Sequence, residues 1–478
     1  MDQPAKKPSL AWYRGLDRTC WIVLAIAALG WLFDTMDQSL FNIVRRPSLS
    51  ELLHPHPAKA PLSSEERGRL DDDVKRWSGI TTSVFLAGWA TGGFIFGILG
   101  DRLGRTRTMI VTILIYAAFT GLSGLVHDVW SYSIMRFATA LGVGGEWAAG
   151  AALVAEVFPE RSKPMALGLL QALPTVGNLT ASLITYGIGD LERGWRWAYF
   201  IGAAPALLVV WIRMSVKEPQ TWKEAKERAT VGREMGNIAE LFTHPVLRRN
   251  TIAAVLMATA GVGAFWGISV FSPELLSAEL MNRLPRKEVG ETVSKMFMLL
   301  NLGAFAGLYL FAVFAERLTR RAAFHVWFTL GWASVLVFFW SVSGAGLAAK
   351  NISFILAPVV GFCTLGLFSG YAIVFPFLFP TRLRATGCGF CYNIARYLAA
   401  AAPWALGGLA AAMATRDGQG NITRSGYAPA ATIVSAVYLL GYLGTYLVPE
   451  TKGRTLPNDL ESLAREEVPG PAGSSTAV

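Results

Sequence analysis

The amino-acid sequence is dominated by apolar segments long enough to cross a membrane as helices. A span needs about 20 mostly apolar residues. Twelve segments qualify, at approximately 19–42, 79–99, 108–126, 130–153, 164–187, 195–214, 250–273, 292–315, 323–342, 351–375, 388–411 and 428–447. Only 16% of the 478 residues are charged and 53% are hydrophobic, which excludes a soluble protein, with its roughly 25% charged residues, and a disordered chain. The sequence therefore predicts an all-α membrane protein with twelve transmembrane helices.

The net charge of +10 is explained better by membrane topology than by a nucleic-acid partner. Lysine and arginine concentrate in loops on the cytoplasmic side of a membrane, and here they are more numerous on the side of the two chain ends. No small-residue cleavage site follows the first apolar segment, so we interpret it as a helix rather than a signal peptide. We expect a multi-pass protein of a bacterial inner (plasma) membrane, with both termini cytoplasmic and no nucleic-acid partner.

Two short motifs recur in the same order in the two halves of the chain. GDRLGRTR (100–107) follows the second apolar segment and AERLTRRA (315–322) follows the eighth. VFPERSKP (157–164) follows the fourth and LFPTRLRA (378–385) follows the tenth. Such duplication is typical of secondary transporters, whose two bundles rock about a site at the membrane midplane.

This repeat predicts two pseudo-symmetric six-helix bundles. We divide the chain into a cytoplasmic N-terminus at 1–18, an N-terminal bundle at 19–214 with a long external loop at 43–78, a cytoplasmic linker at 215–249, a C-terminal bundle at 250–449 and a cytoplasmic tail at 450–478.

Three motifs resemble those of the major facilitator superfamily, and the resemblance covers about residues 10–456. GILGDRLGRTR (97–107) is similar to the superfamily's signature after the second helix. RFATALGVGG (136–145) resembles its fourth-helix motif, with Ala140 in place of the first glycine, and PETKGRTL (449–456) resembles the ending common in sugar and organic-acid members. The resemblance implies the twelve-helix fold of that superfamily and transport by alternating access.

Finer resemblances indicate proton-coupled symporters of organic acids. GWLFDTMDQSLF (30–41) is similar to a first-helix pattern of aromatic-acid and sialic-acid symporters. GFCYN (389–393) looks like sialic-acid members, Arg396 looks like the aromatic-acid and nicotinate group, and LGVGGEW (141–147) looks like metabolite–proton symporters. The resemblance therefore implies import of a small organic anion, with the group left open between aromatic acids, nicotinate and sialic acid.

The charged motif after the second helix has the composition of a cytoplasmic gate. Its arginines can pair with Asp101, with helix C-termini or with acids of the other half, and such pairs would bias one access state against the other. The alternative is a basic anchor at the membrane surface. The gate candidates are Gly97, Asp101, Arg102, Gly104, Arg105, Arg107, Glu156, Arg161, Glu316, Arg317 and Arg320.

Three acids within the apolar segments are candidates for proton coupling. Asp34 and Asp37 are three residues apart and share one helix face. Two carboxyl groups that lie close together in a low-dielectric cavity are not readily ionised at the same time, so one of them keeps a proton more easily. A group that loads and releases a proton during transport must be able to hold it in this way. Glu146 is the third candidate. The structural alternatives are a cap or ion pair for an aspartate, and a buried protonated carboxyl group for Glu146.

Two arginines within the apolar segments are candidates for binding the anion. Arg136 and Arg396 would each be costly at membrane depth without a partner or a cavity. A planar guanidinium suits a carboxylate, and Asn393 and Tyr392 lie one turn before Arg396. The alternatives are an ion pair of Arg136 with a first-segment aspartate and structural hydrogen bonds of Arg396. Further substrate candidates are Gln171, Asn178, Trp266, Asn301 and Tyr371.

No motif indicates catalysis, a cofactor or a metal. The chain has no P-loop, so we expect the proton gradient and not ATP to drive it, and we expect a monomer that is not an enzyme. Its partners would be the substrate, protons and the lipid bilayer. Two alternatives remain: a neutral sugar or polyol porter, favoured by PETKGR (449–454), and a membrane sensor that does not transport.

Overall fold

The computed structural model of the chain describes residues 12–54, 64–188, 194–204, 211–212, 215–229, 234–267, 271–280, 283–399, 406, 408–410, 412–416, 422–424 and 426–465. The first half contains α1 (Arg18–Leu53), α2 (Ser64–Arg102), α3 (Arg105–Ser123), α4 (Val129–Val157), α5 (Lys163–Ala172), α6 (Pro174–Gly187) and α7 (Gly194–Gly202). The linker contains α9 (Gln220–Glu227) and α10 (Glu240–Thr243).

The second half repeats this helical pattern. It contains α11 (Pro245–Gly267), α12 (Ser272–Leu280), α13 (Arg286–Arg317), α14 (Arg320–Val342), α15 (Ala348–Val374), the 3-10 turns η2 (Phe375–Leu378) and η3 (Thr381–Leu383), α16 (Arg384–Ala399), α18 (Tyr427–Val434), η4 (Ser435–Val437) and α19 (Tyr438–Leu447), followed by α20 (Leu460–Arg465). A short antiparallel hairpin, β1 (Thr415–Arg416) with β2 (Ile422–Arg424), precedes α18.

The helices confirm the prediction of an all-α membrane protein. Among the described residues, nine helical segments are long and apolar enough to cross a membrane. The predicted spans 195–214, 250–273 and 388–411 overlap α7, α11 and α16, and each also includes residues outside the described ranges. The predicted terminal segments 1–18 and 450–478 likewise lie partly outside them.

The predicted external loop at 43–78 is wrong for most of its described length, which is helical. α1 continues to Leu53 and α2 already begins at Ser64. The 36 residues of α1 make it about 54 Å long, well beyond the roughly 30 Å of a membrane core. The extension is held against α7, because Glu51 accepts a hydrogen bond from Trp195 at 2.7 Å and pairs with Arg196 at 3.3 Å.

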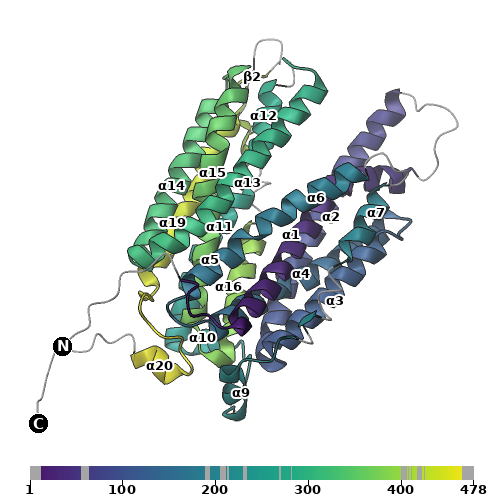
Figure 1. Cartoon of the computed structure of the whole chain (residues 1–478). Coiled ribbons are helices and arrows are strands. Elements are labelled where there is room, and N and C mark those ends of the chain that lie inside the picture. The colour runs from purple at the N-terminus through teal and green to yellow at the C-terminus, as the bar shows by residue number, and fades with distance from the viewer. Residues whose placement is uncertain are drawn as a thin grey trace, which may run out of the picture.

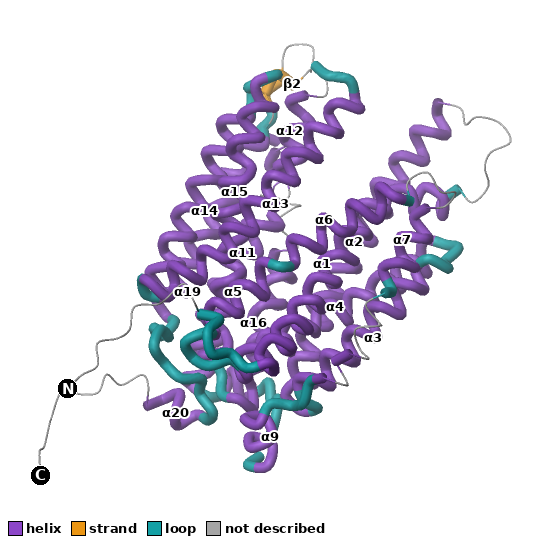
Figure 2. The backbone as a smooth tube through the Cα atoms, in the orientation of Figure 1, coloured by secondary structure: helices purple, strands orange, loops and turns teal. Residues whose placement is uncertain are grey.

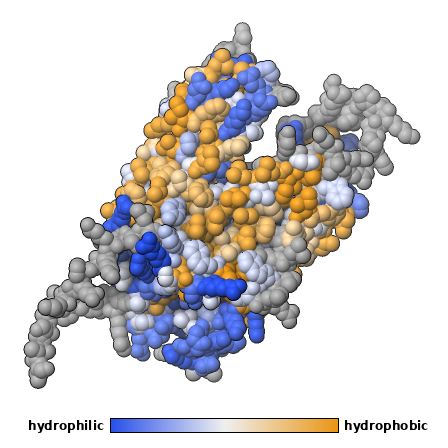
Figure 3. Space-filling model, viewed as in Figure 1, coloured by the Kyte–Doolittle hydropathy of each residue, from blue (hydrophilic) through white to orange (hydrophobic). Residues whose placement is uncertain are grey.

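The helices form two bundles, α1–α7 and α11–α19 (Figure 1). The bundles meet at the end that holds α9, α10 and α20, here called the linker end. They lean apart toward the end that holds α12 and β2, here called the far end (Figure 2). Across the boundary, α2 packs against α16 and α5 against α13. Apolar surface covers both bundles, and hydrophilic surface gathers at the linker end and again at the far end of the C-terminal bundle (Figure 3).

Glycines allow neighbouring helices to touch through their backbones. A Cβ atom at Gly303 on α13 would collide with the carbonyl oxygen of Pro358 on α15, and one at Gly92 on α2 would collide with that of Leu141 on α4. Small residues at such contacts are typical of membrane helices, where dispersion replaces the hydrophobic effect as the source of packing energy.

We expect Gly303→Ala to lower the thermal unfolding temperature of the detergent-purified protein, because overpacking a close helix contact costs about 1–3 kcal/mol. The matched control is Gly290→Ala on the same helix, where an added Cβ meets nothing within 4 Å. Equal unfolding temperatures for the two variants would contradict the close α13–α15 contact.

Candidate functional site

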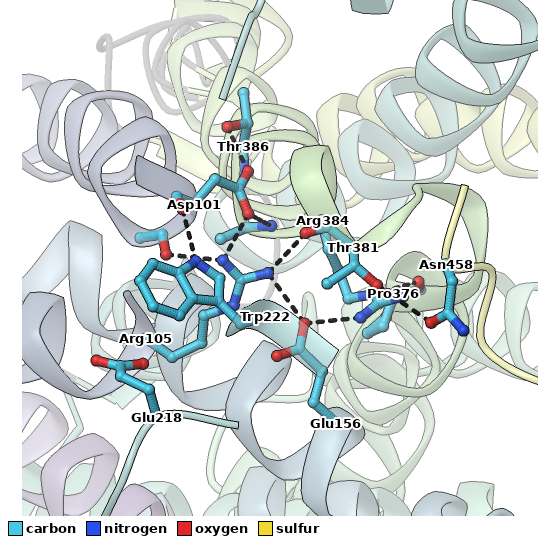
Figure 4. Close-up of polar contacts among 12 residues, drawn as sticks. Asp101, Arg105, Glu156, Glu218, Trp222, Pro376, Thr381, Arg384, Thr386 and Asn458 are labelled. Atoms are coloured by element: carbon cyan, nitrogen blue, oxygen red, sulfur yellow. Dashed lines mark hydrogen bonds and ion pairs between the residues drawn. The ribbon is translucent and has the colours of Figure 1, made fainter. Parts of the chain in front are cut away.

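At the linker end, Asp101 of α2 caps a helix of the other bundle (Figure 4). Its carboxylate accepts hydrogen bonds from the backbone N–H groups of Ala385, at 3.1 Å, and Thr386, at 2.8 Å, and from the Thr386 hydroxyl at 2.6 Å. These groups lie in the first turn of α16, where N–H groups lack helical partners and the helix dipole favours an anion. Asp101 therefore joins the N-terminal bundle directly to the C-terminal one.

Arg105 extends this contact into a buried ionic network. Its guanidinium pairs with Asp101 at 2.8 Å and Glu156 at 2.9 Å, and it donates to the carbonyl of Thr381 at 2.7 Å. Glu156 also pairs with Arg384 at 2.7 Å. Thr381 and Arg384 belong to the second half, so the network crosses the boundary repeatedly. The four charged side chains are at most 1% exposed, and removing one partner of such a pair costs about 3–5 kcal/mol.

The linker lies against the same network. The indole of Trp222 on α9 donates to the backbone carbonyl of Asp101 at 2.7 Å. Glu218 accepts from the backbone N–H of Arg107 at 3.1 Å and so caps the start of α3. Gly104 makes the turn before α3 with φ +113°, a conformation that side-chain-bearing residues rarely adopt.

Two other predicted gate residues also lie at this boundary. Arg102 donates to the carbonyl of Met235 in the linker at 3.1 Å. Gly97 packs on α16, where an added Cβ would lie 2.9 Å from the carbonyl oxygen of Ala385. Among the predicted gate residues, Arg161 is exposed at the turn before α5.

The corresponding C-terminal motif makes its hydrogen bonds and ion pairs within its own bundle, as far as the described residues show. Glu316 pairs with Arg320 at 3.8 Å, and Arg320 donates to Thr451 at 3.0 Å. The carbonyl of Arg317 accepts from Lys452 at 3.4 Å. Residues of both motifs are gate candidates in the sequence, but among the described residues the first motif bridges the bundles through such contacts and the second does not.

Glu450 anchors the segment after the last helix. Its carboxylate accepts from the backbone N–H groups of Arg320 and Arg321, each at 3.1 Å, and of Lys452 at 2.9 Å. Burial acts to raise the pKa of Glu450, but these N–H groups together hold that pKa below its usual value. The PETKGR segment therefore caps α14 at the linker end.

We expect Asp101→Asn to open the linker end. The neutral amide no longer balances Arg105, at a cost of about 3 kcal/mol or more. Cys388 lies buried on α16, in electrostatic range of the network. In a variant with Cys388 as its only cysteine, Asp101→Asn should raise the rate of maleimide labelling about tenfold or more. Glu227→Gln, an exposed carboxylate on α9, is the control. Unchanged labelling would contradict a latch role for Asp101.

Deeper in the N-terminal bundle, Asp37 and Arg136 form a buried pair. Arg136 lies 3.5 Å from Asp37, whose same oxygen accepts from the Thr120 hydroxyl at 2.6 Å. The guanidinium also donates to Ser123 at 2.6 Å and lies 4.4 Å from the ring centroid of Tyr199. Arg136 therefore makes this ion pair and these hydrogen bonds within the N-terminal bundle. Its pair with Asp37 is the arrangement that the sequence offered as the alternative to anion binding.

Asp34 and Glu146 lie in the same interior without such partners. Each is 1% exposed, and none of their four carboxyl oxygens has a hydrogen-bond partner among the described residues. The hydroxyl of Tyr116 on α3 is likewise buried and unpaired there. Asp34 is in electrostatic range of both Glu146 and Asp37. The three acids predicted from the sequence are therefore brought together, in two different environments.

Arg396 in the C-terminal bundle is held between two aromatic rings. Its guanidinium carbon lies 4.3 Å from the ring centroid of Trp89 on α2 and 4.3 Å from that of Tyr392. One nitrogen donates to Asn393 at 2.6 Å, whereas Nε has no partner among the described residues. The residue is 5% exposed. No acidic side chain of the described residues pairs with it, in contrast to Arg136.

Trp147 and Gln171 extend the Arg396 site into the N-terminal bundle. The Trp147 ring stacks on Tyr392 with centroids 4.1 Å apart and planes at 22°. Gln171 accepts from the Trp147 indole at 3.0 Å and donates to the carbonyl of Phe368 on α15 at 3.0 Å. The Trp147–Tyr392 stack and the hydrogen bond from Gln171 to Phe368 join the two bundles at membrane depth.

Asn178 and Asn301 form a second polar bridge between the bundles. Asn178 on α6 donates to Asn301 on α13 at 3.0 Å, and it accepts from Ser39 on α1 at 2.6 Å. Trp266 packs its ring against Trp89, with centroids 6.4 Å apart. These three predicted residues therefore lie at or beside the boundary that a substrate would cross.

Tyr371 is placed differently from the other substrate candidates. Its side chain is fully buried, and its hydroxyl donates to the carbonyl of Met257 on α11 at 2.8 Å. An added Cβ at Gly261 on α11 would collide with this hydroxyl. Tyr371 thus joins α15 to α11 inside the C-terminal bundle.

Several residues of the site were not singled out from the sequence. Arg384 and Thr381 belong to LFPTRLRA (378–385), so the internal repeat carried a signal for them. Trp89 and Trp147 are two of 16 tryptophans, and Tyr116 is a single phenol within an apolar segment. Trp147 ends LGVGGEW (141–147), which the sequence resemblance already included. The roles of Trp89 and Tyr116 depend on which helices pack together, and nothing in the local sequence distinguishes these two residues.

The protein has long apolar helices in two bundles, charges buried at membrane depth and an ionic latch at one end. These features define a membrane transporter rather than an enzyme. The family model described as Major Facilitator Superfamily matches residues 27–403, and the chain belongs to this family. It is therefore an integral membrane protein with a small-molecule substrate.

Curated relatives of the chain include transporters of organic acids. It is 27% identical to a probable 4-methylmuconolactone transporter of Cupriavidus pinatubonensis, covering 94% of this chain and 95% of that protein. It is 29% identical to the sialic acid transporter NanX of Escherichia coli, covering 82% and 88%. It is 30% identical to a cis,cis-muconate transport protein of Acinetobacter baylyi, covering 70% and 78%.

A solved structure shares the fold. The proton:xylose symporter XylE of E. coli superposes with a TM-score of 0.68 at 16% identity, covering 93% of this chain and 98% of that one. This likeness confirms the major facilitator fold expected from the sequence motifs.

Proposed function

We propose that the protein is a proton-coupled symporter that imports a small organic anion, a carboxylate such as an aromatic acid, nicotinate or sialic acid, by alternating access. Arg396 carries this proposal. Arg396 is a buried cation without an acidic partner among the described residues. A bound carboxylate would supply the negative charge that it lacks. The Nε of Arg396 has no hydrogen-bond partner among the described residues, and a planar guanidinium suits a carboxylate.

The surroundings of Arg396 suit an organic anion. Trp89 and Tyr392 flank the guanidinium, and Trp266 adds a further aromatic surface beside Trp89. Asn393 orients the charge through its side-chain oxygen. The relatives named for muconate, 4-methylmuconolactone and sialic acid support a carboxylate or related organic-acid substrate.

The acids of the N-terminal bundle supply the proton-coupling part of the proposal. Asp34, Asp37 and Glu146 are buried at membrane depth, opposite the bundle that holds Arg396. Anion and proton would then bind to different bundles. In this scheme the proton gradient drives import by a monomer that uses neither ATP nor a cofactor.

We place the linker end and both termini in the cytoplasm, with six helices in each bundle. Basic residues concentrate on that side in the sequence. The network around Asp101 and Arg105 then closes the cytoplasmic side, and the substrate would enter from the far end. The import cycle requires this network to break and re-form.

We expect Arg396→Gln to lower kcat/KM for anion uptake about 10- to 100-fold, because one charge-assisted hydrogen bond contributes about 1.5–3 kcal/mol. Arg396→Lys keeps the charge but loses the planar stack, so its kcat/KM should lie between those of the wild type and Arg396→Gln. Radiolabelled uptake into proteoliposomes is the measurement, with the exposed Arg228→Gln as control. Unimpaired anion uptake by Arg396→Gln would contradict anion binding by Arg396. Transport of a neutral sugar or polyol that Arg396→Gln leaves unchanged would instead favour a neutral porter.

We expect an imposed pH gradient, acidic on the side of the far end, to drive accumulation of a carboxylate in proteoliposomes. Each pH unit is equivalent to about 1.36 kcal/mol, so one proton per anion supports about tenfold accumulation per unit when the transported charge cancels. Collapsing the gradient with a protonophore is the control. Equal uptake with and without the gradient, across a panel of carboxylates, would refute the coupling.

A further inference from the structure

The contact between α1 and α4 aligns three acids along one face. Gly30, Asp34 and Asp37 are spaced four and three residues apart, so they follow one another on the same side of α1. On α4, Glu146 lies against Gly30 and Arg136 lies against Asp37. The line therefore runs from Glu146 near Gly30, past Asp34, to the Asp37–Arg136 pair.

The missing side chain of Gly30 makes room for Glu146. A Cβ atom at position 30 would overlap the Glu146 carboxyl group, with the closest collision at Oε1. The carboxyl group is thus seated on the backbone of α1, one helical turn from Asp34. An alanine at this position would displace the Glu146 carboxyl group from its place on α1 beside Gly30.

The charges along this face do not balance if every acid is ionised. There are three carboxyl groups, and Arg136 pairs with Asp37 at 3.5 Å. Asp34 and Glu146 have no hydrogen-bond partner or ion pair among the described residues. Two adjacent carboxylates in a low-dielectric interior repel each other and lose their hydration. One proton on the pair removes the repulsion and supplies a donor for the second carboxyl group.

A buried tyrosine, Tyr116, lies in electrostatic range of the same acids. Its hydroxyl is fully buried on α3 and has no partner among the described residues. The charged groups in its electrostatic range are Glu146, Asp34 and Asp37. A buried hydroxyl is normally satisfied, so Tyr116 adds a further polar group, unpaired among the described residues, to the interior that holds Asp34 and Glu146.

We infer that the coupling proton resides on the Asp34–Glu146 pair, that Gly30 is the positioning residue that seats Glu146 beside Asp34, and that Asp37 is a fixed partner of Arg136. This inference rests on the proposed function and assigns its proton to one pair of acids. On release, the O–H bond of the protonated carboxyl group breaks and the proton leaves to water, so the pair becomes doubly ionised until it is reloaded.

The orientation of α1 gives the pair a place in the proton path. α1 starts at the linker end and rises toward the far end, so Gly30 and Glu146 lie on the linker-end side of Asp34 and Asp37 lies on its far-end side (Figure 1). A proton that crosses from the far end reaches Asp34 before it can leave from Glu146.

The test compares gradient-driven accumulation with counterflow in proteoliposomes, using Gly30→Ala, Glu146→Gln and Asp37→Asn. We expect Gly30→Ala and Glu146→Gln to lose accumulation, from about tenfold per pH unit to onefold, while counterflow stays measurable. Gly30→Ala removes no ionisable group, so its loss reports the position of Glu146. The control is Gly150→Ala on α4, whose added Cβ makes only ordinary contacts, at 3.7 Å and 3.9 Å.

The outcomes separate the inference from the proposed function. Full accumulation by Glu146→Gln in a coupled wild type would overturn the inference and leave the proposed function standing. The same holds if only Asp37→Asn loses accumulation and keeps counterflow. A wild type that shows counterflow but no gradient-driven accumulation would overturn both. If Gly30→Ala does not fold, Glu146→Gln and Asp37→Asn decide the question.

Discussion

The closed linker end depends on the carboxylate of Asp101 at the first turn of α16. An anion there satisfies N–H groups that the helix itself leaves unpaired, and Arg105 balances its charge on the other side. Because both groups are buried, each depends on the other for stability. The remaining contacts of Glu156, Arg384 and the linker are arranged around this pair.

At the linker end buried charges are paired, whereas in the interior only some of the described buried charges are. Arg136 is neutralised by Asp37 and surrounded by hydroxyl groups. In the part of the chain that the structure describes, Arg396 has two aromatic rings and an amide instead of an acid, and Asp34 and Glu146 pair with no cation. Unpaired charge of opposite sign in opposite bundles is the feature that a co-transport of anion and proton would use.

Much of this arrangement could be predicted from the sequence. The gate motif, the first-helix acids and the two intramembrane arginines stand out because charge is rare in apolar segments. The loop predicted at 43–78 failed because contacts with α7 continue the helix beyond the membrane-length apolar core. The unequal roles of the two repeated motifs were also hidden, since the repeat is symmetric and this conformation is not.

The sequence by itself determined the class of protein, the number and order of apolar segments, and which ionisable groups lie at membrane depth, because these follow from composition and spacing. Only the tertiary structure decided the partners: Asp37 with Arg136, Glu146 against Gly30, and Arg396 between Trp89 and Tyr392. Except for Tyr392, which lies one turn before Arg396 on α16, these partners are far apart in the chain. Helix packing brings them together, and in a low-dielectric interior the partner decides what a charge can do.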